Sequence, residues 1–135
     1  MQIILPAMLA LHILSAIFWA GSTVTLARIG GVEVDRMFRP QMGAALIAAV
    51  TGAALWHFFS GGAFGTAEAI LAAGVLAAIA AAGVQGASIG AARRKLSGAD
   101  PAESARLYAQ MTTAQRIAAG LLVVTAICMA IARYV

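Results

Sequence analysis

Four long runs of apolar residues dominate this sequence and restrict what it can fold into. They cover roughly residues 3–27, 41–60, 67–91 and 113–134, and about 20 apolar residues are enough for a helix to cross a bilayer. Of the 135 residues, 62% are hydrophobic and only 10% are charged, which is outside the range of soluble globular domains. The sequence therefore predicts an all-α integral membrane protein, one domain over residues 1–135, folded as an up-and-down four-helix bundle in a lipid membrane.

The basic residues predict the orientation of this bundle. Eight of the nine Lys and Arg residues lie in or beside the first and third loops. They are Arg28, Arg36, Arg39, Arg93, Arg94, Lys95, Arg106 and Arg116. Because basic residues are retained in cytoplasmic loops, both loops are predicted to be cytoplasmic and both termini to lie outside. The net charge of +4 is then a topology signal, and nucleic acid is not expected as a partner.

Prolines and capping residues predict where two of the helices begin. Pro40 stands at a natural helix start after the polar loop that follows Gly30. The segment Asp100-Pro101-Ala102-Glu103 predicts an N-cap, a proline at the first helical position and an acid at the third, after a turn of about residues 92–100. The polar first turns of that last helix, which include Gln115, are expected to protrude into the cytoplasm or lie along the headgroups.

The third span consists almost entirely of small residues. Ala82, Gly86 and Gly90 are spaced four apart, which favours close helix packing within the bundle or against a neighbouring protomer. A homo-oligomer or a membrane-complex partner is therefore expected. Gln85, the polar side chain in the middle of this span, is predicted to form a hydrogen bond between helices.

An ionisable side chain, His12, lies inside the first apolar run. Such a residue indicates a functional site, because burying it without a partner is costly. The second histidine, His57, ends the second span, and both are predicted in the outer half of the membrane. Two imidazoles at similar depth on adjacent helices can hold a haem iron from both faces. Trp19 is then expected beside the haem, and Arg133 is expected to pair with a propionate.

Several short motifs carry a family resemblance. They are Leu11-His12 with Trp19-Ala20-Gly21, then Phe38-Arg39-Pro40, Thr51-Gly52, and Met129-Ala130-Ile131-Ala132-Arg133-Tyr134. In these the chain resembles small bacterial membrane proteins of the CopD-like group, and HemJ-type protoporphyrinogen oxidases share its histidine-to-Trp-x-Gly first span. The resemblance implies a four-helix, haem-binding or copper-related multi-pass protein of the bacterial inner membrane, in which His12 matches the family histidine.

The leading hypothesis is a b-type haem protein that transfers electrons in the outer half of the membrane, with His12 and His57 as axial ligands. Activity as a haem-dependent membrane oxidoreductase stays open. One alternative is copper handling through soft and imidazole ligands, which are Met8, His12, His57, Cys128 and Met129. Another is an accessory subunit without a catalytic role. In a purely structural role, His12 would instead bond within the bundle to Ser15 or Gln85.

Overall fold

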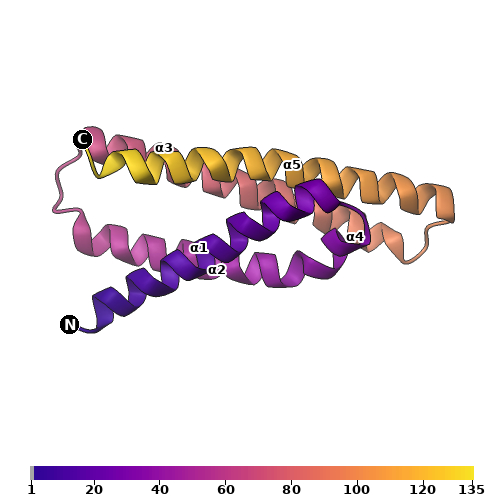
Figure 1. Ribbon diagram of the computed structural model, residues 1–135, viewed down its shortest axis with the longest axis horizontal. Coiled ribbons are helices and arrows are strands. Elements are labelled where there is room, and N and C mark those ends of the chain that lie inside the picture. The colour runs from indigo at the N-terminus through magenta and orange to yellow at the C-terminus, as the bar shows by residue number, and fades with distance from the viewer. Residues whose placement is uncertain (1) are drawn as a thin grey trace.

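The computed structural model describes residues 2–135, which form helices joined by short turns. The helices are α1 (Ile4–Ile29), α2 (Val32–Phe59), α3 (Thr66–Val84), the π-helical turn η1 (Gln85–Ile89), α4 (Gly90–Leu96) and α5 (Pro101–Ala132). Because η1 joins α3 to α4 without a break, Thr66–Leu96 is one rod, and each of the four rods is long and apolar enough to cross a membrane. The predicted all-α four-helix bundle is confirmed, and the two ends of the chain lie at the same end of it (Figure 1).

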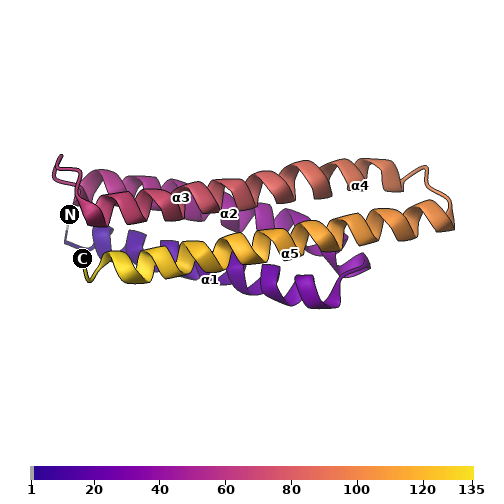
Figure 2. The same cartoon turned by 90° about the horizontal axis from the view of Figure 1, so that it is seen from above.

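The rods are arranged as two packed pairs. Helix α1 packs on α2, and α3 packs on α5, while α1 also contacts α5. Figure 2 shows α3 and α5 lying side by side along most of their length. The outward faces carry large apolar side chains such as Leu14, Leu46 and Leu76, which are 66%, 65% and 67% exposed. This apolar exterior suits lipid, and the chain is a multi-pass membrane protein.

Small residues fill the interior, so the helix backbones approach closely. One buried cluster contains Trp19 and Leu122 packed among alanines, which are Ala44, Ala45, Ala48, Ala81 and Ala118. A second cluster, toward the α1–α2 turn, consists of Leu26, Val34, Ile89, Ala92, Leu107, Met111 and Ala114. Helix α3 lies close to α5 at Gly74, where an added Cβ would lie 2.9 Å from Cβ of Cys128.

Two glycines form the whole connection between α1 and α2. Gly30 and Gly31 both have φ of 65°, a left-handed conformation that side chains disfavour. The Gly30 N–H donates to the Leu26 carbonyl at 2.8 Å and so closes the last turn of α1. A Cβ on Gly30 would lie only 2.7 Å from Oγ1 of Thr112. The absence of side chains here therefore lets the turn rest directly on α5.

The helix ends differ from the prediction in two places and agree in a third. The turn predicted at about residues 92–100 is shorter, because α4 continues the third rod to Leu96. Helix α2 begins at Val32 rather than at Pro40, so the first loop is shorter than expected. The physical reason is burial, because Val34 is fully enclosed in the second cluster and extends the helix past the proline. Helix α5 begins as predicted, with Asp100 accepting a hydrogen bond from the Glu103 N–H at 2.8 Å and Pro101 in the first turn.

The predicted small-residue contact on the third span lies elsewhere within the bundle. Apart from its own stretch of helix, nothing in the described chain lies within 4 Å of the Cβ position of Gly86, and at Gly90 the nearest atom is Cζ of Phe38 at 3.7 Å. The tight contact is at Gly74 instead, because there the Thr125 hydroxyl donates to the Gly74 carbonyl at 3.0 Å and holds α5 against α3. Close packing in this span is thus real, but it is centred about three turns earlier in the chain.

Candidate functional site

The centre of the bundle contains a closed network of neutral polar side chains. Gln41, Gln85, Gln115 and Thr23 come from four different rods and are all fully buried. The network also includes Trp19, whose Nε1 donates to Oε1 of Gln85 at 2.7 Å. Within residues 2–135 no buried side-chain nitrogen or oxygen lacks a hydrogen-bond partner. A fully satisfied network of this kind fixes the register of the helices, since shifting any helix would leave buried donors and acceptors without partners.

The indole of Trp19 sets the direction of every bond in this network. An indole N–H only donates, so Oε1 of Gln85 accepts and its Nε2 donates to Oε1 of Gln115 at 2.9 Å and to Oγ1 of Thr23 at 3.0 Å. Nε2 of Gln115 then donates to Oε1 of Gln41 at 2.7 Å. Nε2 of Gln41 completes the circuit by donating to Oγ1 of Thr23 at 3.1 Å. The Thr23 hydroxyl donates its own proton to the Trp19 carbonyl at 2.7 Å.

The π-helical turn places Gln85 in this network. Ala81, Gln85 and Ile89 are all fully buried although they are four residues apart. In a regular α-helix, positions at this spacing drift around the axis, and the wider π turn compensates for the drift. The extra turn width therefore keeps the glutamine directed at the bundle axis while the apolar residues on both sides stay in the core.

His12 lies between α1 and α2, two turns before Trp19. Its half-buried imidazole has Nδ1 2.9 Å from the Ala48 carbonyl oxygen and 3.1 Å from Oγ1 of Thr51. The ring also covers Gly52, where an added Cβ would lie 2.9 Å from Cε1. The absence of a side chain at Gly52 therefore makes the room that the imidazole occupies.

These contacts determine which ring nitrogen of His12 carries the proton. A carbonyl oxygen only accepts, so Nδ1 is the protonated nitrogen that donates to Ala48. The hydroxyl of Thr51 donates to the Ile47 carbonyl at 2.6 Å and so offers its oxygen to the ring. In the neutral imidazole Nε2 then holds the lone pair, and it makes no hydrogen bond to any residue that the structure describes. This is the tautomer that binds a metal through Nε2 with a backbone carbonyl orienting the ring.

The structure places the predicted second ligand and the two other residues predicted at the haem at three separate positions. His57 is exposed, with its ring edge-on to Phe58 at a centroid distance of 5.6 Å. It lies six residues beyond Thr51, about 9 Å along α2 and about 120° around it. Trp19 is buried in the glutamine network, and Arg133 is exposed with its guanidinium 5.2 Å from the Tyr134 ring centroid.

The soft side chains of the copper hypothesis lie on different helix pairs. Met8, Cys128 and Met129 are all half-buried. Cys128 packs on Gly74 between α3 and α5, whereas His12 packs on Gly52 between α1 and α2. In the part of the chain that the structure describes, no three His, Cys, Asp or Glu side chains are grouped to hold a metal ion.

Sequence reasoning predicted that Gln85 bonds between helices but missed the two other glutamines of the network, Gln115 and Gln41. Gln115 was expected in the polar, protruding part of α5 and is instead fully buried, because it faces Gln41 and Gln85 across the bundle axis. The signal for Gln41 is its spacing of seven from the buried residues Val34 and Ala48. A seven-residue spacing keeps a side chain on the same face of a packed helix.

Comparison of the chain with protein-family models, with curated proteins and with solved structures found no match. The function is therefore argued from the site itself.

Proposed function

We propose that the protein binds b-type haem through Nε2 of His12 and transfers electrons in the outer half of a bacterial inner membrane. The observation that carries the proposal is the hydrogen bond from Nδ1 to the Ala48 carbonyl, which commits that nitrogen and leaves Nε2 as a ligand. The glycine at position 52 makes the room that the ring occupies, so the imidazole is held with Nε2 uncommitted. When bound, a haem with two imidazole ligands supplies one-electron chemistry between the ferric and ferrous states.

The residues around His12 fit this role in three respects. The ring is held in one tautomer by the Ala48 carbonyl, it packs over the bare backbone of Gly52, and it is only half buried, so it is reachable from the surface of α1 and α2. Arg133 lies at the end of the bundle that also carries the start of α1. It offers an exposed guanidinium for a propionate.

The second axial ligand is proposed to be His12 of a second copy of this chain. His57 projects from a different part of α2 and is exposed, whereas two copies related by a two-fold axis present identical imidazoles to each other. This arrangement needs a homodimer with α1 and α2 at the interface. In such a dimer, His12 of each protomer would hold the haem through one ring nitrogen.

A reduced-minus-oxidised visible spectrum of the purified protein tests the proposal, both as isolated and after addition of haemin. The parent should show the sharp α and Soret bands of low-spin haem, and His12→Ala should lose the haem or shift both bands. His57→Ala is the matched control, because it removes the other imidazole from an exposed position. Its spectrum should equal that of the parent.

Two outcomes would contradict the proposal. A parent protein that takes up no haem under either condition would refute haem binding. Bound copper that is lost on Met8→Ala or Cys128→Ser as well as on His12→Ala would favour the copper hypothesis.

A further inference from the structure

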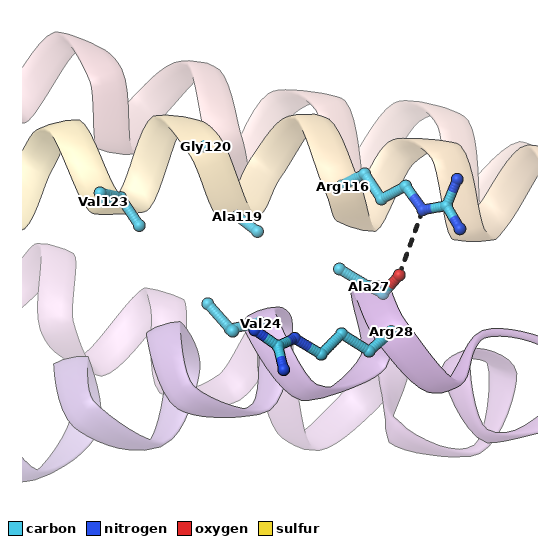
Figure 3. Close-up of a pocket in the computed structure, with 7 residues that line it drawn as sticks. All are labelled: Val24, Ala27, Arg28, Arg116, Ala119, Gly120 and Val123. Carbon is cyan, nitrogen blue, oxygen red and sulfur yellow. Dashed lines mark hydrogen bonds between the residues drawn. The ribbon is translucent and has the colours of Figure 1, made fainter.

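A groove between α1 and α5 is lined by two arginines and by small or apolar side chains. The residues are Val24, Ala27 and Arg28 on α1 and Arg116, Ala119, Gly120 and Val123 on α5 (Figure 3). The α1 residues recur at spacings of three and four, and the α5 residues do the same, so each set is one face of its helix. The groove has a volume of about 540 Å³ and runs along the helix axes over about 10 Å of α5.

The floor of the groove is low because its central residues are small. Ala27 and Ala119 contribute only methyl groups, and Gly120 contributes no side chain. Val24 and Val123 continue the apolar wall toward the middle of the predicted span, and both are exposed. A slot with these dimensions and this lining fits a lipid acyl chain lying parallel to the helices.

Both arginines have their backbone at the end of the groove nearest the α1–α2 turn, but Figure 3 shows the Arg28 guanidinium extending along the groove toward Val24, while that of Arg116 points away from Val123. Arg28 is in the last turn of α1, and Nε of Arg116 donates to the Ala27 carbonyl at 3.2 Å (Figure 3). Neither guanidinium forms an ion pair in the described chain, whereas Arg36, Arg93 and Arg106 each pair with a carboxylate. The groove therefore combines an apolar slot with two positive charges that have no protein counter-ion.

Two hydrogen bonds join the end of α1 to α5 at this end of the groove. The Gly31 N–H is 3.3 Å from Oγ1 of Thr112, one turn before Arg116 on α5. Together with the bond from Arg116 to Ala27, this contact fixes the end of α1 on α5. The position of the Arg116 guanidinium then follows from the fold, whereas the exposed Arg28 side chain extends from the fixed last turn of α1 without a hydrogen bond in the described chain.

From charge complementarity and shape we infer that this groove binds an anionic phospholipid of the cytoplasmic leaflet. Its phosphate lies between Arg28 and Arg116, and one acyl chain lies over Gly120. The basic loops at this end predict that it faces the cytoplasm, and basic pockets between helices on that side suit anionic headgroups.

The test measures phospholipid retention by native mass spectrometry of the full chain, with phosphatidylglycerol and phosphatidylcholine offered at equal concentration. The parent should retain phosphatidylglycerol in preference. Arg28→Gln, which removes a side chain without a hydrogen bond in the described structure, should lower that retention about fivefold, the effect of one basic residue near a membrane surface. Arg106→Gln is the control, because it removes the same single positive charge. This variant should retain as much phosphatidylglycerol as the parent, since Arg106 lies outside the groove.

A second variant tests the slot separately from the charge. Gly120→Leu fills the floor and leaves both arginines, so it should lower retention of phosphatidylglycerol while the melting temperature stays near that of the parent, because nothing lies within 4 Å of its Cβ position. Inorganic phosphate at millimolar concentration should not displace the lipid.

Three results would overturn the inference. Equal retention of the two lipids by the parent would show that the arginines do not select a headgroup. Equal losses in Arg28→Gln and Arg106→Gln would show a general charge effect. Displacement by inorganic phosphate alone would show a phosphate site that does not require the acyl chain.

Discussion

Replacing Gln85 by Leu should destabilise the bundle more than any surface substitution of the same kind. Leu is close to Gln in size but cannot bond, so the change removes one hydrogen bond from Trp19 and the bonds to Thr23 and Gln115. Hydrogen bonds between helices in membrane proteins average about 0.6 kcal/mol each. The buried indole N–H is also left without an acceptor, which costs about 1–3 kcal/mol. The free energy of unfolding should fall by about 3 kcal/mol, a roughly hundredfold change in the unfolding constant.

Equilibrium unfolding in mixed micelles, with the denaturing detergent as variable, measures this change. Gln110→Leu is the matched control, because Gln110 is exposed and makes one bond at 3.3 Å to the Ser88 carbonyl. Its effect should stay within about 0.5 kcal/mol. A double-mutant cycle of Gln85→Leu with Trp19→Phe should show a coupling of more than about 0.5 kcal/mol. If Gln85→Leu changes stability no more than Gln110→Leu does, the network does not hold the bundle together.

Further substitutions test the glycine contacts and the topology. Gly52→Ala should lose haem and cost about 1–3 kcal/mol, because its Cβ would lie 2.9 Å from Cε1 of the imidazole; unchanged haem content in the purified variant would contradict the role given to this glycine. Gly74→Ala should lower thermal stability by a similar amount by separating α3 from α5, and adding Cys128→Gly should restore part of it, since the clash at 2.9 Å is with that residue's Cβ. A cysteine at Ser97 should resist a membrane-impermeant thiol reagent in intact cells while one at Gly62 reacts, and the reverse labelling would invert the orientation.

The sequence predicted those parts of the fold that depend on local chemistry. Apolar length is sufficient to predict four spans, and Asp100 followed by Pro101 is sufficient to predict the start of α5, because neither depends on distant residues. The start of α2 was not predicted, because it depends on contacts between helices. Burial of Val34 against other helices extends it, and that contact is tertiary.

In the candidate site, too, single residues were predictable from the sequence but their partners on other helices were not. His12 and Gln85 were predictable because a polar side chain in an apolar run is conspicuous. The partner of His12 was not, since the Ala48 carbonyl reaches Nδ1 only through the register of α1 against α2. Gln115 was assigned to a polar surface because it follows other polar residues, and only the assembled bundle turns it toward Gln41.

The ratio of haem to protein in the purified, haem-saturated sample tests the central claim most directly. If Nε2 of His12 from each of two protomers holds one iron, haem assay against chain concentration should give one haem per two chains. His12→Ala should bring that ratio to zero at unchanged helical content, while His57→Ala should leave it at one to two. A ratio of one haem per chain, or a ratio that His12→Ala does not change, would contradict the account.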